Sequence, residues 1–270
     1  MIARKFLALA ALAVPAIAAA QTGAPVSGNL SVVSDYRFRG ISQTYLGPAV
    51  QGGVDYSHPS GVYVGNWNSS VSSAVYTGGS GIEMDFYGGW KKSFGDVGID
   101  AGGIFYYYPM AECNQNNACS TAGSTDFNNL EAYFGASWKW LSGKLFYALT
   151  DYFGLAGEQA AGYWTNKATG APLGGRGSSD GTWYLDLNVN VPLTKEISLV
   201  AHYGKLEVNK YNELDYKDWK LGLTYDLSGW LLGAAYVDTD ANNDFYYTFG
   251  SKGNKETGSS TVVFSVTKAF

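Results

Sequence analysis

The sequence predicts an all-β protein, a transmembrane antiparallel up-and-down β-barrel of about 12 strands. Three observations support this fold class. Apolar and polar residues alternate in segments that recur about every twenty residues, which is typical of half-buried strands. The connections between these segments alternate between long and short. Aromatic residues gather at the ends of the predicted strands, as they do in the girdles of membrane barrels.

The composition favours many short strands joined by tight turns. Charged residues make up 15% of the chain, against about 25% in an ordinary globular domain, and there are 35 Gly against 7 Pro. No sustained helical periodicity is present. The formal net charge of −5 argues against a nucleic-acid partner, because binding nucleic acid requires clustered Lys and Arg. The sequence implies no cofactor.

The first 20 residues, MIARKFLALAALAVPAIAAA, have the features of a secretory signal peptide. Arg4 and Lys5 precede an apolar run, and Ala18–Ala20 form a cleavage site of the A-x-A type. Length alone allows the remaining chain to be one large β domain or two smaller ones. We expect a signal peptide over residues 1–20 and one outer-membrane barrel over residues 21–270.

The first predicted strand, residues 30–39, runs into the segment SDYRFRGISQT, residues 34–44. By phase, Tyr36 and Phe38 face lipid, and Asp35, Arg37 and Arg39 face the interior. Gly40 then begins the first outer loop. The third strand, in GVYVGNWNS, is ambiguous in phase. The eighth is the clearest, with Trp183, Leu185, Leu187, Val189 and Val191 opposite Tyr184, Asp186, Asn188 and Asn190.

The connections indicate how the barrel is oriented. Short turns such as HPSG, SFGD, WLSG, PLTKE and LSG alternate with long polar loops. Outer-membrane barrels have tight periplasmic turns and longer outer loops, and an even strand number returns both termini to the periplasm. Closure is required because lipid offers no partner to a free strand edge.

The aromatic residues fall into two predicted girdles on the lipid face. Trp90, Trp138, Trp230 and Phe270 lie at periplasmic strand ends, and Phe38, Tyr107, Trp183, Trp219 and Tyr236 lie at or near outer ends. The alternative is core packing in a large secreted sandwich, which would not sort aromatic residues by strand end.

The predicted interior carries most of the charged residues. The pore-lining candidates are Asp35, Arg37, Arg39, Asp55, Glu83, Asp85, Asp100, Glu131, Lys139, Asp186, Lys220 and Asp226. They form either a cross-strand network that fills a narrow lumen or charged rings that set the ion preference of a channel.

Two cysteines and two histidines are the remaining candidates for site chemistry. Cys113 and Cys119 in ECNQNNACS predict a local disulfide, because a metal site would need further ligands nearby. His58 lies in the HPSG turn, and His202 has the interior phase of its strand. No nucleophile motif accompanies either histidine, so the sequence predicts no enzyme, catalytic residue or metal ligand.

The segment SDYRFRGISQT, together with PAVQGGVDYSHPSGVYVGNW, EMDFYGGW, YYYP and GTWYLDLNVNVPL, resembles the TorF-type porin family of Gram-negative bacteria. The similarity extends from about residue 27 to Phe270, and Asp35, Tyr36 and residues 39–44 are its most specific part. It implies an outer-membrane β-barrel and transfers no catalytic role. The chain end TKAF resembles the terminal signal read by the barrel-assembly machinery, with Phe270 as its last residue.

Together these features predict a porin-like channel for passive diffusion of small hydrophilic solutes or ions. Its expected partners are outer-membrane lipid, the assembly machinery and those solutes. One alternative is a closed barrel with a structural or surface-interaction role and no conductance. A weaker alternative is an outer-membrane hydrolase that uses His202. An excess of interior acidic residues predicts a weak preference for cations.

Overall fold

The computed structural model describes residues 25–114 and 124–270. The predicted signal peptide and Cys119 lie outside the described residues.

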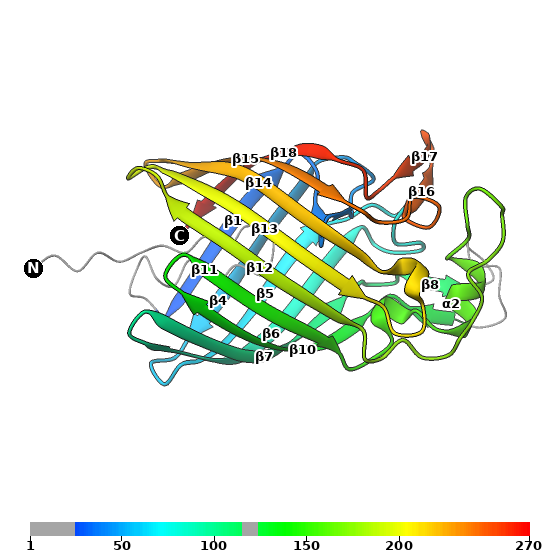
Figure 1. The fold of residues 1–270 in the computed structure, drawn as a ribbon, viewed down its shortest axis with the longest axis horizontal. Helices are drawn as coiled ribbons and strands as arrows, with labels where there is room; N and C mark the ends of the chain where they lie inside the picture. The colour runs from blue at the N-terminus through cyan, green and yellow to red at the C-terminus, as the bar shows by residue number, and fades with distance from the viewer. Residues whose placement is uncertain (1–24, 115–123) are drawn as a thin grey trace, which may run out of the picture.

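Twelve antiparallel strands form one closed barrel (Figure 1). In chain order they are β1 (Val26–Val33), β4 (Ala49–Ser57), β5 (Val62–Ser70), β6 (Ile82–Phe94), β7 (Val97–Tyr107), β10 (Asn129–Trp138), β11 (Leu141–Ala148), β12 (Trp183–Pro192), β13 (Ile197–Glu207), β14 (Tyr216–Leu227), β15 (Trp230–Thr239) and β18 (Thr261–Ala269). Each strand pairs with its neighbours in this order, and β1 pairs with β18 from Asn29↔Ala269 to Val33↔Ser265. The predicted fold class and strand number are confirmed.

Short turns and long loops lie at opposite ends of the barrel (Figure 1). The turns at the end where the C-terminus lies, here called the short-turn end, comprise residues 58–61, 95–96, 139–140, 193–196 and 228–229. The turn at Ser228 and Gly229 has positive φ at both residues, 53° and 84°, which matches the twist of a two-residue hairpin. The opposite end is called the long-loop end.

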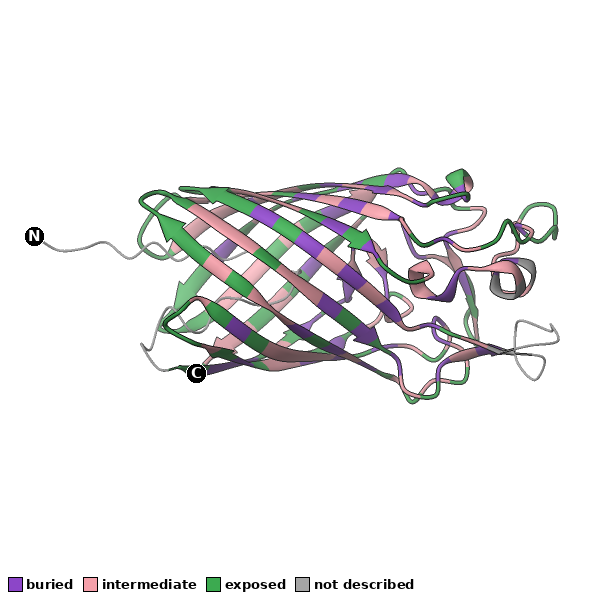
Figure 2. Ribbon diagram, turned by 90° about the horizontal axis from the view of Figure 1, so that it is seen from below, coloured by how far each residue is buried: buried purple, intermediate pink, exposed green. Residues whose placement is uncertain are grey.

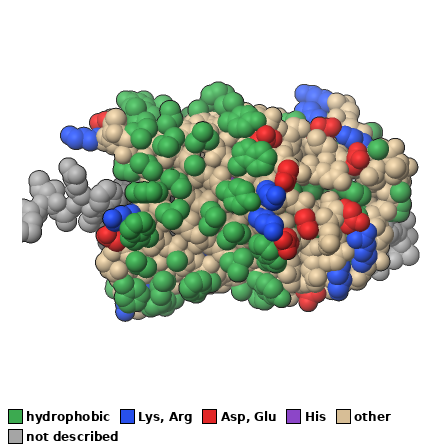
Figure 3. Space-filling model, viewed as in Figure 1, with side chains coloured by type: hydrophobic (Ala, Val, Ile, Leu, Met, Phe, Trp, Pro, Cys, Tyr) green, Lys and Arg blue, Asp and Glu red, His purple; other side chains and the backbone are tan. Residues whose placement is uncertain are grey.

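The outward face of the barrel is apolar, as the alternation predicts. Buried and exposed residues alternate along the barrel strands (Figure 2). On β1 and β4, for example, Leu30 is 54% exposed and Val50 is 56% exposed, whereas their inward neighbours Asn29 and Gln51 are buried. Apolar side chains gather over the half of the barrel nearer the short turns, and charged side chains lie mostly beyond this band (Figure 3). Among the described residues no helix is long and apolar enough to cross a membrane.

Within the described residues, the long loops add three small hairpins and little helix. The hairpins are β2 (Arg37–Phe38) with β3 (Ile41–Ser42), β8 (Glu112–Asn114) with β9 (Ser124–Asp126), and β16 (Tyr247–Gly250) with β17 (Gly253–Glu256). Helical segments are α2 (Gly157–Gly162), η1 (Tyr152–Gly154) and η2 (Asn212–Leu214).

Buried aromatic rings pack the long loops against one another at the long-loop end. Tyr76 and Tyr108 stack at 4.0 Å between ring centroids, and Phe127 lies edge-on to both Tyr76 and Tyr163. Tyr246 connects the last long loop to this cluster through Trp164. Apolar burial therefore ties the loops into one compact layer over that end of the barrel.

The prediction for the first strand is wrong beyond Val33. The chain does not continue along the wall but turns inward, and residues 34–47 form a segment that we call the inner hairpin. Tyr36 is 3% exposed and Phe38 packs against Tyr106 and Phe153, so neither side chain faces outward and Phe38 is not a girdle residue. The chain reverses at Arg39 and Gly40, which have φ of 49° and 81°.

Candidate functional site

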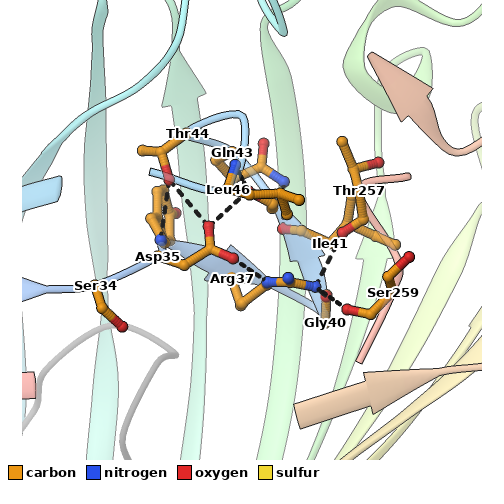
Figure 4. Close-up of polar contacts among 12 residues, drawn as sticks. Ser34, Asp35, Arg37, Gly40, Ile41, Gln43, Thr44, Leu46, Thr257 and Ser259 are labelled. Atoms are coloured by element: carbon orange, nitrogen blue, oxygen red, sulfur yellow. Dashed lines mark hydrogen bonds and ion pairs between the residues drawn. The ribbon is translucent and has the colours of Figure 1, made fainter. Parts of the chain in front are cut away.

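The inner hairpin is fixed to the barrel near its last strand by Arg37 (Figure 4). The Arg37 guanidinium donates to Asp35 at 2.6 Å and to the carbonyl oxygens of Thr257 and Ser259 at 3.0 and 2.9 Å. Asp35 also accepts hydrogen bonds from Ser42 and Thr44, at 2.6 and 3.1 Å. A charged pair in the hairpin therefore holds its own turn and the loop before β18 together.

Arg39 fixes the tip of the inner hairpin to the opposite wall. Its guanidinium forms a two-pronged ion pair with Glu131 on β10, at 3.0 and 2.6 Å. It also lies over the rings of Tyr184 and Phe38, at 4.4 and 4.8 Å from their centroids. Tyr216 on β14 donates to the Arg39 carbonyl oxygen at 2.8 Å.

Tyr36 and Gln43 fix a further side of the inner hairpin to the wall and to the long loops. The Tyr36 hydroxyl donates to Glu83 on β6 at 2.9 Å, and its ring lies edge-on to Trp67 on β5. Tyr76 donates to the Gln43 side chain at 2.5 Å. The inner hairpin thus contacts inward-facing residues of β5, β6, β7, β10 and β14, so it occupies the cross-section of the barrel and narrows it.

A cavity of about 330 Å³ runs from the inner hairpin toward the short-turn end. Tyr36, Arg37, Phe38 and Arg39 line it at the hairpin, and Lys195, Glu196 and Gly229 line it near the short turns. The wall between is rich in amides and hydroxyls: Asn29, Ser31, Gln51, Asn188, Asn190, Ser198, Thr224, Ser265 and Thr267. Such a lining can hydrogen-bond to water and to polar solutes.

The other half of the lumen is filled by tyrosine side chains and their acidic partners. Tyr63 hydrogen-bonds to Tyr133 and donates to Asp100 at 2.6 Å, and Lys144 pairs with Asp100 at 2.8 Å. Farther round the wall, Tyr87 donates to Asp55 at 2.6 Å. Most residues that line the open space therefore lie on β12–β15, β18, β1 and β4. From the tyrosine-filled half, the cavity is lined by Trp67, Asp85, Tyr106 and Phe146.

His202 lies between two carboxylates on the cavity wall. Its Nδ1 is 3.1 Å from Asp186 and its Nε2 is 2.8 Å from Asp218. Tyr184 donates to Asp218 at 2.9 Å, and Lys220 stands directly opposite His202 in the β13–β14 register. An imidazole with a carboxylate at each nitrogen can donate to both, and neither nitrogen is then left to activate a hydroxyl nucleophile.

The pore-lining candidates occupy four settings. Arg37, Arg39, Asp85, Asp186, Lys220 and Asp226 line the cavity. Asp35, Glu83 and Glu131 are buried beside the inner hairpin, and Asp55 and Asp100 lie in the tyrosine-filled half. Lys139 is misplaced, because β10 ends at Trp138 and Lys139 begins the turn, where its Nζ lies over the outward Trp138 ring. Any role of these residues in conduction stays a prediction.

Two important residues of the interior were not predicted. Trp67 lines the cavity from β5, whose phase the sequence left ambiguous, although Tyr63, Gly65, Trp67 and Ser69 alternate on the inward side. Asp218 lies two residues before the predicted inward Lys220, so period-2 alternation extended toward the start of β14 would have found it.

The predicted girdle residues other than Phe38 lie on the outward face. Trp90, Trp138 and Trp230 are exposed at the short-turn end, Tyr107, Trp219 and Tyr236 are exposed toward the long-loop end, and Trp183 is half-buried beneath Lys205. The Phe270 backbone exchanges two hydrogen bonds with Gly28, at 2.8 and 3.0 Å, beside the seam where β1 pairs with β18.

Cys113 is buried on β8. Because Cys119 lies outside the described residues, the disulfide between them stays a prediction.

Solved porin structures have a similar architecture at very low sequence identity. The KdgM porin matches with a TM-score of 0.50 and 9% identity, over 90% of this chain and 99% of that chain. The KdgM porin in complex with disordered oligogalacturonate matches with a TM-score of 0.49 and 8% identity, over 91% and 98% of the two chains. The NanC porin matches with a TM-score of 0.48 and 9% identity, over 90% and 98%. At this identity the likeness to the KdgM porin is one of fold.

No curated protein sequence matches the chain. The family model described as "Bacterial protein of unknown function (Gcw_chp)" matches residues 17–270, which is nearly the whole sequence. The chain therefore belongs to the Gcw_chp family of bacterial proteins.

Proposed function

We propose that this protein is a porin-like channel of the Gram-negative outer membrane for passive diffusion of small hydrophilic solutes or ions. The observation that carries the proposal is a cavity with amide, hydroxyl and charged side chains in its wall, inside a closed barrel whose outward face is apolar. A barrel with only a structural role has no need of a cavity lined by amides and hydroxyls. The sequence resemblance to TorF-type porins and the shared fold of the KdgM porin support the same function.

The inner hairpin would act as the size filter. A solute that enters from the short-turn end travels through the cavity and meets Tyr36, Phe38 and Arg39. Passage beyond this level requires a path beside the hairpin or a displacement of it. We therefore propose a narrow channel with low conductance, in which the hairpin and nearby charged groups set size and charge selection.

The membrane setting is part of the proposal. The outward aromatic residues would lie at the two headgroup levels, the long-loop end would face outward from the cell, and Phe270 would be read by the assembly machinery. Residues 1–20 would direct export and be removed, and Cys113 would pair with Cys119 in the oxidising periplasm.

A closed barrel with a surface role is the second candidate. The observation that favours it is the combination of the buried inner hairpin with the packed layer of long loops, which together obstruct the long-loop end. In that case the loops would meet partners and the cavity would carry no flux.

Conductance across a planar lipid bilayer tests the proposal. The mature chain is refolded in detergent, its folded state is verified by heat-dependent mobility on a gel, and single insertions are recorded in KCl. Discrete conductance steps support the channel, and a salt gradient then tests the predicted weak cation preference through the reversal potential. Well-folded protein that inserts without conductance would contradict the channel and favour the closed barrel.

A further inference from the structure

Two carboxylates beside the inner hairpin have no cationic side chain among their partners. Glu83 and Asp85 both point inward from β6 and are 0% and 2% exposed. The Tyr36 hydroxyl occupies one oxygen of Glu83. The other Glu83 oxygen, Oε2, and Asp85 Oδ1 are buried and have no hydrogen-bond partner among the described residues.

The nearby basic groups are already engaged with other acids. Arg37 pairs with Asp35, Arg39 pairs with Glu131, and His202 lies between Asp186 and Asp218. Tyr76 and Tyr108, which also lie near Glu83, are neutral hydroxyl groups at ordinary pH, and Glu131 adds a further acid near Asp85. The wall at this level therefore carries more acidic than basic side chains. A buried charge of this kind is costly unless a cation or a proton accompanies it.

Asp85 opens onto the cavity next to an aromatic ring. It lines the cavity together with Trp67, and the two residues stand directly opposite each other in the β5–β6 register. Tyr36 lies edge-on to Trp67, with 5.5 Å between ring centroids, and lines the same space. A solute that reaches this level thus meets a carboxylate and aromatic rings together.

This combination fits an organic ammonium group better than a divalent metal ion. The pair offers two carboxylates on one strand, whereas Ca²⁺ takes about six to eight oxygen ligands. An ammonium group needs fewer acceptors, forms charge-assisted hydrogen bonds to carboxylates, and is attracted to the faces of Trp and Tyr rings. A cavity of about 330 Å³ is large enough for a small amine.

We propose that Asp85 and Trp67, with the buried Glu83 on the same strand as Asp85, form a binding site for solutes that carry a positively charged amine. The inference rests on the proposed channel function and gives it a solute class, because the site lies where the cavity meets the inner hairpin. A cationic amine would lie between the Asp85 carboxylate and the Trp67 ring, and would compensate the unpaired acidic oxygens.

Calorimetric titration of the refolded mature chain in detergent tests the site without requiring conductance. The probe is n-butylammonium chloride, with n-butanol as the neutral control and sodium butyrate as the anionic control. We expect binding of butylammonium alone. Asp85→Asn, which keeps the side-chain shape, should weaken binding at least tenfold, and Trp67→Leu should weaken it severalfold. The matched control is Asp226→Asn, which removes an acid from the same cavity near the short turns.

Each result separates the binding site from the channel. Three results would overturn the site: unchanged affinity in Asp85→Asn, equal binding of butanol, or no binding of butylammonium. The third result is expected if Glu83 and Asp85 share a proton, so that no cation is needed. Glu83→Gln serves as a second variant if Asp85→Asn fails the heat-mobility test. Binding of butylammonium without bilayer conductance would support the site and contradict the channel. Conductance without butylammonium binding would support the channel and contradict the site.

Discussion

At the residue scale, Arg39 is the strongest single link between the inner hairpin and the wall. Its side chain combines a two-pronged ion pair to Glu131 with ring contacts to Tyr184 and Phe38, and all of these groups are largely shielded from water. Removing one partner of a buried ion pair costs more than the pair contributes, because the other charge is left buried and unpaired. We therefore expect Arg39 to hold the inner hairpin in its position against the barrel wall.

Arg39→Ala should lower the free energy of unfolding by about 3 kcal/mol, because Glu131 loses its buried cationic partner. This value is at the lower end of the range for a broken buried ion pair, because the hairpin can move away from the wall and let water reach Glu131. Urea unfolding in detergent measures the loss. Protease cleavage within residues 34–47 should rise in the same variant.

The matched variant is Arg39→Ala combined with Glu131→Gln. If the uncompensated Glu131 charge is the main cost, this double variant should be more stable than Arg39→Ala alone. Equal stability of the two would contradict that explanation.

Gly204 is a second residue on which the site depends. A Cβ at this position would clash with the Tyr184 hydroxyl and with the Asp218 carboxylate, the two groups that meet beside His202. Gly204→Ala should therefore cost about 1–3 kcal/mol, because Tyr184 and Asp218 must shift and weaken their hydrogen bonds. Gly103→Ala is the control, since its Cβ would meet only the Glu131 carbonyl oxygen at 3.4 Å. Equal urea midpoints for the two variants would refute the argument.

Single-residue positions were predictable where a strand continues and unpredictable where it ends. Asp186 and Lys220 sit mid-strand, and their inward phase follows from alternation. Lys139 was misplaced by one step past the end of β10, and Phe38 by five residues past the end of β1. Alternation in the sequence predicts which side of a strand each residue faces, but it does not predict the residue at which the strand ends.

At the element scale, the inner hairpin has the same sequence signature as a wall strand. Both of its strands are extended, so Tyr36, Phe38 and the charges between them alternate as they would in the barrel. The local sequence signal of this reversal is Gly40, which with Arg39 adopts positive φ in the turn. The partners that distinguish the two structures, Glu83, Glu131 and Thr257, lie far away in sequence, which is why the sequence alone could not place the hairpin inside.

Replacing residues 36–46 by a flexible Gly-Ser linker should widen the pore. The substitution removes Tyr36, Phe38 and Arg39 from the cross-section and leaves β1 and β4 intact. We expect a severalfold higher single-channel conductance in the planar bilayer and a larger cut-off for neutral polymers added to the bath. The barrel should still form, because its strands pair directly with one another around the full circle.

The control for this variant is deletion of Ala168–Gly170, at an exposed turn of the long loop before β12. Conductance should not change in the control. An unchanged conductance in the linker variant would show that the inner hairpin does not limit the pore.

At the scale of the whole molecule, the lumen is divided into a filled half and an open half. Tyrosine side chains occupy most of the space along β5, β6 and β10, whereas small residues such as Gly233 and Ser265 leave room along β15 and β18. The even strand number and the alternation of connections fixed the barrel in advance. The division could not be predicted, because it depends on which inward side chains face each other across the lumen.

We expect the long loops to respond to acid, because two ion pairs join them. Arg176 in the loop before β12 pairs with Glu213 at 2.5 Å, and Lys167 in the same loop pairs with Glu256 at 2.8 Å. Hydrogen bonds from Arg176 lower the pKa of Glu213, and Lys167 lowers the pKa of Glu256, each below the ordinary value of 4.5. A lowered folded-state pKa stabilises the docked loops above pH 4.5, and this contribution is lost as the pH falls through the folded-state pKa.

Loop protection from hydrogen exchange should therefore decrease on acidification while the barrel strands stay protected. Exposed pairs contribute about 1 kcal/mol or less, so the decrease between about pH 6 and about pH 3 should be less than about tenfold for residues 163–177 and 253–257, after correction for intrinsic exchange rates. The variant Glu213→Gln with Glu256→Gln carries no titrating partner at either position. It should show lower protection at pH 6 and little further change on acidification, because the neutral amides cannot lose a charge. If its protection falls with pH as steeply as that of the wild type, some other group controls the docking of the loops.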